Sequence, residues 1–286
     1  MRFHMDTAEI FVPDGSPSDT ALGRTTHLGI GAHQDDLEIM AFHGILECFR
    51  REDQWFSGVV VTDGSGSPRD GAYRDYSDKR MQSVRRAEQK KAAVVGEYAA
   101  QVLLDHPSGA VKDPTSLVVV EDLQRVLAAS RPQTVYTHNL ADKHDTHVGV
   151  ALRVIEALRG LKADERPLKV YGCEVWKDLD WLSDSEKVAF DVSPHENLQA
   201  ALLGVFDSQI AGGKRYDLAT LGRRRANATY YATHGVDLTT GTTFAMDLTP
   251  LILDPDLQPG DFIKRFIDGF HKETADRLLR LGGPPK

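Results

Sequence analysis

Two short segments of this 286-residue chain combine histidines with carboxylates at close spacing. The first, His33-Gln-Asp-Asp-Leu-Glu38, carries an imidazole and two adjacent aspartates directly after a short apolar run. The second runs from His138 to His147, and its last two histidines, His144 and His147, are three residues apart. At the start of a helix, residues at this spacing project to one side. Each segment can therefore present several metal-binding groups to one point.

Adjacent residues in a turn point in different directions, so Asp35 and Asp36 can have different roles. One carboxylate can bind a metal ion while the other faces a metal-bound water. His33, Asp36 and one imidazole of the second segment form a set of two histidines and one carboxylate. Catalytic zinc sites commonly use three protein ligands and leave the fourth position to water, and zinc accepts mixed nitrogen and oxygen ligands, whereas magnesium prefers oxygen. Any one of these residues could simply cap a helix, but the two segments together predict a zinc site.

Strand-like and helix-like runs alternate along the chain and must position these segments. The strand-like runs are residues 27–32, 55–62, 101–104, 133–137 and 168–175. Apolar residues at helical spacing indicate helices at 39–49, 79–98, 117–129, 148–158, 197–210 and 262–281. This alternation predicts an α/β fold with a mostly parallel sheet and helices on both faces.

Ligands of such sheets bind beyond the carboxyl ends of the strands. This rule selects the loops 33–38, 63–80 and 138–147, and the two histidine segments are the first and third of them. We predict an N-terminal arm over residues 1–25 and a single domain over 26–286. Within that domain, the core covers about 26–210 and a smaller C-terminal extension covers about 211–286.

Composition excludes several classes of protein. A net charge of −8, from 42 acidic and 34 basic residues, argues against a general nucleic-acid binder. No apolar run approaches the roughly 20 residues that span a bilayer, so membrane insertion is not expected. The first 26 residues lack the basic-then-apolar order of a signal peptide. With only two cysteines and therefore no disulfide framework, we expect a cytoplasmic protein.

Both segments resemble signatures of a known family. Ala32-His-Gln-Asp-Asp36, followed by Glu38, resembles the first signature of the PIG-L/LmbE-like zinc N-deacetylases, and His144-Asp-Thr-His147 resembles the second. Weaker similarities lie between and beyond these signatures, at 62–64, 85–88, 174–176 and 208–209. The resemblance covers about residues 26–210. It implies a Rossmann-like fold and the removal of an acetyl group from an N-acetylglucosamine-type amino sugar or its conjugate.

The resemblance also implies roles for individual residues. His33, Asp36 and His147 would be the zinc ligands, Asp35 the general base, and His144 the charged residue that stabilises the oxyanion. Two positions depart from the family pattern. Gln34 replaces the usual proline, and Thr146 stands where a carboxylate usually orients the auxiliary histidine, so that Asp142 or Asp145 would have to substitute.

Candidate substrate contacts follow from position and charge. Residues 69–91 hold eight basic and four acidic residues, a local surplus that could steer an anionic substrate. Asp63 follows a strand and could accept a hydrogen bond from a sugar hydroxyl, while Arg85 or Arg86 could bind a polar group. His234 is a further candidate, and Trp176 and Tyr216 could stack on a sugar ring. We read Arg223-Arg-Arg225 as a surface run. The expected partner is a small amino-sugar molecule, and a homo-oligomer is left open.

Three other functions compete with this interpretation. His33-x-Asp35 with a distant histidine also matches the facial triad of non-haem iron oxygenases, although those enzymes are usually β-barrels. A nucleotide-binding protein could use Gly29-x-Gly31, but the third glycine of that fingerprint is absent. A non-catalytic sugar-binding protein on the same fold is the third alternative.

Overall fold

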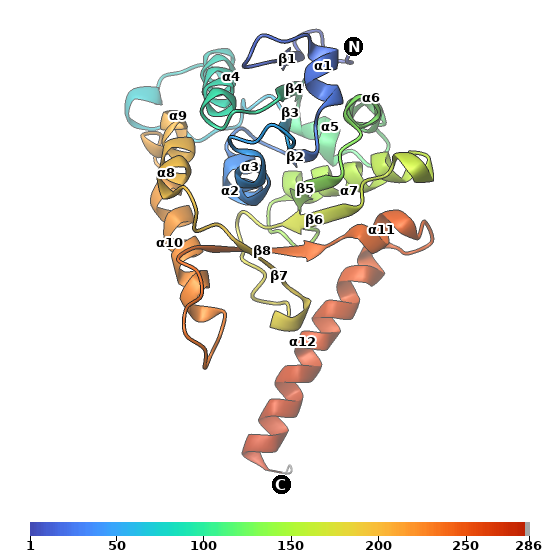
Figure 1. The fold of residues 1–286 in the computed structure, drawn as a ribbon, viewed down its shortest axis with the longest axis vertical. Helices are drawn as coiled ribbons and strands as arrows, with labels where there is room; N and C mark the ends of the chain where they lie inside the picture. The colour runs from blue at the N-terminus through green and yellow to red at the C-terminus, as the bar shows by residue number, and fades with distance from the viewer. Residues whose placement is uncertain (284–286) are drawn as a thin grey trace.

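The computed structural model describes residues 1–283, and its centre is a sheet of five parallel strands (Figure 1). These are β2 (His27–Gly31), β3 (Phe56–Thr62), β4 (Ala100–His106), β5 (Thr134–His138) and β6 (Lys169–Cys173), arranged in the order β4-β3-β2-β5-β6. Three antiparallel strands extend the sheet: β1 (Glu9–Phe11) beside β4, β8 (Thr242–Asp247) beside β6, and β7 (Val188–Asp191) beside β8. The predicted α/β fold with a mostly parallel sheet is confirmed.

Burial on both faces explains the composition of the central strands. All seven residues of β3 are buried, and the strand reads as a β-branched run without polar alternation. Gly29 in β2 is needed for close packing, because a Cβ atom there would lie 2.7 Å from the ring of Phe56. The sheet therefore forms the middle layer of the domain.

Helices cover both faces, as predicted. One apolar cluster joins the sheet to α1 (Ser18–Gly23), α6 (Val118–Ser130), α7 (Asp145–Arg159) and α11 (Thr249–Leu253). The other cluster joins it to α2 (Asp36–Met40), α3 (Phe42–Cys48), α4 (Asp78–Val95) and α8 (Glu196–Gly204). The remaining α-helices are α5 (Ser108–Lys112), α9 (Asp207–Ile210), α10 (Tyr216–Tyr230) and α12 (Pro259–Gly282). Within residues 1–283, no helix has the length and apolar character needed to cross a bilayer.

Element boundaries differ from the sequence prediction where the chain changes direction. The expected helix 39–49 is two helices, α2 and α3, which meet at Ala41. The helix expected from 148 begins at Asp145, so that His147 lies in its first turn. Residues 1–25, described above as an arm, contribute the edge strand β1 and helix α1, and both ends of the sheet are antiparallel strands.

The order of the parallel strands creates a switch point. From β2 the chain builds outward to β3 and β4 on one side, and then returns to place β5 on the other side of β2. The loops after β2 and β5 therefore leave neighbouring strands in opposite directions and open a crevice between them. This crevice receives both histidine segments.

Candidate functional site

The two histidine segments are positioned by a strand end and two helix starts. His33 follows β2, and Asp36 is the first residue of α2. The turn between them is tight, because the backbone N–H of His33 donates to Asp36 Oδ2 at 2.6 Å and Asp35 adopts a left-handed φ of 96°. His144 caps α7, and His147 lies in its first turn.

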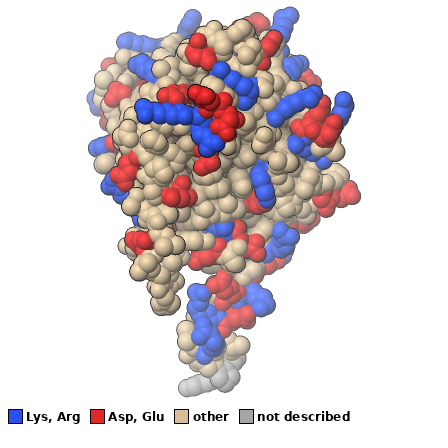
Figure 2. Space-filling view, viewed as in Figure 1, with Lys and Arg blue, Asp and Glu red and all other residues tan. Residues whose placement is uncertain are grey.

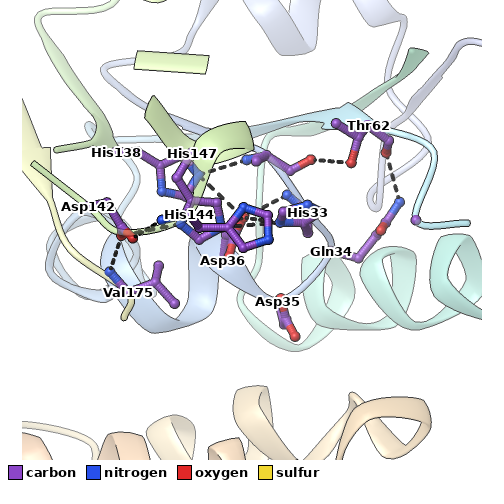
Figure 3. Close-up of polar contacts among 12 residues, drawn as sticks. His33, Gln34, Asp35, Asp36, Thr62, His138, Asp142, His144, His147 and Val175 are labelled. Carbon is purple, nitrogen blue, oxygen red and sulfur yellow. Dashed lines mark hydrogen bonds and ion pairs between the residues drawn. The ribbon is translucent and has the colours of Figure 1, made fainter. Parts of the chain in front are cut away.

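Three predicted ligand atoms converge on one point (Figure 3). His33 Nδ1 lies 3.2 Å from His147 Nε2 and 3.2 Å from Asp36 Oδ2, and His147 Nε2 lies 3.5 Å from the same Asp36 oxygen. Neighbouring ligands of a tetrahedral zinc with bonds of about 2.0–2.1 Å are separated by roughly 3.3–3.4 Å. The two nitrogens and one oxygen therefore have the types and the spacing that this ion requires.

Hydrogen bonds show which nitrogen of His147 faces this point. Asp142 Oδ2 lies 3.2 Å from His147 Nδ1, so the carboxylate accepts the proton there and leaves the Nε2 lone pair directed at Asp36. The same carboxylate accepts from the backbone N–H groups of His144 and Val175. Asp142 thus orients His147, whereas the sequence suggested it as a substitute partner for the ring of His144.

His138 adds a third ring nitrogen close to the Asp36 carboxylate. Its Nε2 lies 3.3 Å from Asp36 Oδ2 and also accepts a hydrogen bond from the backbone N–H of Ala32 at 2.9 Å. The ring stacks on His147 with centroids 3.9 Å apart. The sequence prediction did not include His138 among the site residues, although it is the last residue of β5 and the rule that selected His33 applies to it equally.

The electrostatic environment of this cluster favours a cation. Burial would raise the pKa of Asp36, but the charge of His147 and the neighbouring His138 and His33 rings outweigh burial and lower this pKa well below its usual value. Burial would lower the pKa of His147, but Asp36 and Asp142 outweigh burial and raise it. The negative oxygen of Asp36 is therefore stabilised by positive charge beside it, which a proton on His147 or a metal ion can supply.

Asp35 has different surroundings from its neighbour. Burial raises the pKa of Asp35 to about 8, with further contributions from the charges of Asp36 and Glu38, while Arg85 acts in the opposite direction. Arg85 Nη1 lies 3.6 Å from Asp35 Oδ2. Figure 3 shows the Asp35 carboxylate apart from the histidines. The two aspartates therefore differ in environment, as their adjacent positions in a turn suggested.

His144 lies between the candidate ligands and an aromatic wall. Its ring stacks on His147 with centroids 4.6 Å apart, and it lies parallel to Trp176 at 6.4 Å. Nδ1 is buried without a hydrogen-bond partner. Burial lowers the pKa of His144, and the charges of His147 and His33 lower it further. These surroundings favour the neutral imidazole, whereas the family resemblance implied a charged one.

A cavity of about 340 Å³ opens beside this cluster. The cavity is lined by the candidate ligands and by the two predicted catalytic residues, Asp35 and His144. Its lining also includes two basic and two aromatic side chains: Arg85, Lys214, Trp176 and Tyr216. Trp176 and Tyr216 meet edge to face with centroids 5.8 Å apart. The cavity thus combines a polar floor with an aromatic wall.

Three predicted substrate contacts do not line this cavity. Asp63 accepts from the backbone N–H of Ser65 and from Gln82 within its own neighbourhood. Arg86 follows Arg85 on α4 and is rotated by about 100° around the helix axis, so it points away from the cavity and binds Asp105 at 2.8 Å. His234 is exposed in the segment between α10 and β8.

One residue of the supposed surface run is instead part of the support for the site. Arg224 is buried and donates to the backbone carbonyls of Glu38 and Ile39 at 2.8 and 3.1 Å. These carbonyls belong to α2, whose first residue is the candidate ligand Asp36. The expectation of a surface run was therefore wrong at Arg224, because α10 turns this one arginine of the three towards α2.

Comparison with known proteins gives one family and several similar folds. Residues 28–158 match the model of the family described as PIG-L, GlcNAc-PI de-N-acetylase. No curated protein sequence matches the chain. The conserved protein TT1542 from Thermus thermophilus has 18% identity and a TM-score of 0.60, with 82% of this chain and 99% of that chain covered.

Two further structures of similar fold have stated activities. The N,N'-diacetylchitobiose deacetylase from Pyrococcus horikoshii has 17% identity and a TM-score of 0.57, covering 81% of this chain and 88% of its own. GalB, the 4-carboxy-2-hydroxymuconate hydratase from Pseudomonas putida KT2440, has 15% identity and a TM-score of 0.57, covering 78% and 96%. A fold shared by a deacetylase and a hydratase does not decide the reaction.

The family match is more specific than the fold, because it contains both histidine segments in order and the strands that carry them. Residues 28–158, a little under half of the chain, therefore match the PIG-L family in the part that carries both histidine segments.

Proposed function

We propose that this protein is a zinc-dependent hydrolase that removes the acetyl group from an N-acetylglucosamine-type amino sugar or its conjugate. The observation that carries the proposal is the convergence of His33, Asp36 and His147 at the wall of a cavity that Asp35 also lines. The family description and the printed activity of the chitobiose deacetylase support the same reaction class.

The three converging atoms would hold the ion, and Asp142 would keep His147 in the ligating tautomer. When bound, zinc polarises an amide carbonyl and lowers the pKa of a coordinated water from 15.7 towards about 7. Two imidazole nitrogens and one carboxylate oxygen are a donor set that zinc accepts and that magnesium disfavours.

Asp35 would act as the general base. Its carboxylate takes a proton from the attacking water and later returns it to the amine that leaves. A proton acceptor works best when its pKa is close to the operating pH, and burial raises the pKa of Asp35 to about 8. Arg85 lies 3.6 Å away and would hold the carboxylate in place while its charge limits this rise.

His144 would stabilise the oxygen that becomes negative as the amide carbon turns tetrahedral. Since its surroundings favour the neutral ring, we propose that it donates one N–H rather than acting as a cation. Its ring orientation would come from stacking on His147 and Trp176, because Thr146 supplies no carboxylate.

The substrate would lie between the metal centre and the aromatic wall. A cavity of about 340 Å³ is at the small end of ligand sites and suits one sugar ring with its N-acetyl group. Trp176 and Tyr216 offer flat apolar surfaces to the ring. We include a cytoplasmic location in the proposal, because both cysteines are free and buried, as is usual in a reducing compartment.

The direct test is acetate release by the purified protein from a panel of N-acetylglucosamine derivatives. We expect release that is lost after chelation, restored by zinc, and independent of oxygen. Binding of the sugars without acetate release would instead support a sugar-binding protein, and turnover that needs iron and oxygen would support the oxygenase alternative. Three residues outside the cavity remain proposed substrate contacts only if their alanine variants raise KM: Asp63, Arg86 and His234.

A further inference from the structure

The C-terminal helix α12 leaves the body of the protein (Figure 1). Its first turns are anchored, since Phe262 and Ile263 are buried in the core. Further along, large apolar side chains are exposed: Ile267 is 48% exposed, Phe270 42%, Leu278 68% and Leu281 73%. Such a series on one helix requires an explanation, because helices with this pattern usually bury their apolar side.

The exposed apolar residues form a stripe with internal symmetry. At about 100° per residue, Ile267, Phe270, Thr274, Leu278 and Leu281 fall within an arc of about 80°. Counted from Thr274, apolar residues stand four and seven positions away in both directions. A stripe with this property is the same when it is read from either end, so it matches a second copy of itself that runs antiparallel.

The base of the stripe continues into an apolar groove on the body. On the body, the groove is lined by Leu140, which precedes α7, and by Val148 and Leu152 of α7. On α12, it is lined by Ile263 and Ile267. Ile263 and Ile267 lie on the same side of the helix as the stripe. A helix that covered the stripe would therefore end at this groove and could cover it as well.

The charges of α12 favour a helix partner over a lipid surface. Between Pro259 and Gly282 the helix carries five basic and four acidic side chains, and Figure 2 shows both kinds intermixed along it. Many of them pair within the helix, as in Lys272 with Asp276 at 2.9 Å and Arg277 with Glu273 at 2.7 Å. A helix that binds anionic membranes would instead show a clear basic surplus.

We propose that α12 pairs antiparallel with α12 of a second copy of this chain, around a two-fold axis at Thr274. Ile267 of each copy then faces Leu281 of the other, and Phe270 faces Leu278. The two bodies lie at opposite ends of the helix pair, since the stretch 267–282 is roughly 24 Å long. The segment between α10 and β8 projects towards the same end of the molecule as α12 and exposes Val236 and Leu238 (Figure 1).

The mass of the full chain in solution tests the pairing. Light scattering or sedimentation should give twice the 31.6 kDa of one chain, with dissociation on dilution. Phe270→Glu and Leu278→Glu should each give the mass of one chain. Lys272→Glu is the matched control, because it places the same side chain on the opposite side of the helix and should leave the pair intact.

Cysteine cross-linking tests the direction and the register. Cys48 and Cys173 are buried, so an introduced thiol is the reactive one. Thr274→Cys meets its own copy at the two-fold axis and should form a disulfide-linked dimer under mild oxidation. Leu281→Cys should not, because its copies lie about 20 Å apart in the antiparallel pair.

Three results would overturn the proposal. The wild-type chain could have the mass of one copy at every concentration. Leu281→Cys could cross-link as readily as Thr274→Cys, which would mean a parallel pair. The wild-type chain could bind phosphatidylserine vesicles and lose this binding in Phe270→Glu without any change in mass, which would assign the stripe to a membrane. Acetate release is not needed for any of these readouts.

Discussion

Two clusters of histidine and carboxylate side chains lie at the carboxyl edge of the same sheet. The first is the candidate metal centre, with Asp36 surrounded by His33, His138 and His147. In the second, Asp122 of α6 contacts His106 at the end of β4 and His4 of the N-terminal segment. Both aspartates are buried, so burial alone does not distinguish a metal site from a structural cluster.

The difference lies in the source of the positive charge and the hydrogen-bond donors. Asp122 accepts from the backbone N–H of His4 and from Arg125, and His106 and His4 each reach it with one ring nitrogen. The protein itself therefore supplies a cation, Arg125, in the second cluster. Asp36 accepts a single backbone N–H, and its other neighbours are imidazole nitrogens. Imidazole nitrogens and a carboxylate oxygen that face one another, without an arginine or lysine beside them, form a donor set that suits zinc.

The largest expected effect comes from the same substitution made in both clusters. Asp36→Asn should lose the bound metal and reduce acetate release by about 10³-fold or more, because metal activation of water contributes several kcal/mol. Metal content by mass spectrometry and acetate release measure this. Asp122→Asn is the matched control and should keep a full complement of metal. Loss of metal from both variants would remove the distinction between the clusters.

Within the first cluster, the two aspartates should respond differently. Asp35→Asn should keep the metal but lower kcat by about 10²–10⁴-fold, since it removes a general base and leaves the converging atoms in place. The measurement is kcat at saturating substrate together with metal content. Normal turnover of a metal-loaded Asp35→Asn would show that another group takes the proton.

In the second cluster, the expected loss is stability. Asp122→Asn removes the buried carboxylate that binds His4, His106 and Arg125, and the loss of hydrogen bonds to a charged group costs about 1.5–3 kcal/mol. The free energy of unfolding from urea denaturation should fall by this amount. An unchanged free energy would contradict a structural role for Asp122.

A smaller effect should follow from loosening a ligand. Asp142→Asn should weaken zinc binding by about 10–100-fold, because Asp142 accepts the Nδ1 proton of His147 and fixes its orientation. Competition with a chromophoric chelator gives the dissociation constant. Asp145→Asn is a suitable control, since Asp145 is one of the other carboxylates of the same loop. Equal affinities of the two variants would argue against orientation by Asp142.

The smallest expected effect is a pH dependence of stability. Burial lowers the pKa of His106, so the folded protein keeps this ring neutral while the unfolded chain binds a proton below about pH 6.5. The free energy of unfolding should therefore decrease as pH falls from about 6.5 towards the folded pKa, by at most about 1.4 kcal/mol per pH unit for this one proton. His106→Gln should show a shallower decrease in urea denaturation at several pH values. An identical slope in both proteins would mean that His106 does not titrate differently on unfolding.

Much of the fold could be predicted because its signals are local. β-branched runs such as 55–62 and apolar spacing such as that of 117–129 depend on neighbours within one strand or helix, and they match β3 and α6 closely. Elements with little local signal were missed. β1, β7 and β8 are short strands whose stability comes from partners far away in the chain, as in the pairing of β1 with β4.

The same distinction between local signals and long-range contacts applies to the prediction of the candidate site. Chemical type and proximity in sequence predicted that His33, Asp36, His144 and His147 belong together, and the structure brings them to one cavity. The sequence could not show that Arg85 points into the cavity while Arg86 binds Asp105, nor that Arg224 is buried against α2. Direction around a helix axis depends on which side of the helix the core occupies.

The sequence by itself determined the alternation of strands and helices and the presence of histidine–aspartate groups at two strand ends. These features are properties of residue type and of spacing within about ten residues. Only the tertiary structure decided that β5 lies beside β2, that Asp142 binds His147 rather than the ring of His144, and that Asp122 lies beside an arginine while Asp36 lies among imidazoles. The reason is that each of these outcomes depends on the position of a donor, an acceptor or a charge from another part of the chain.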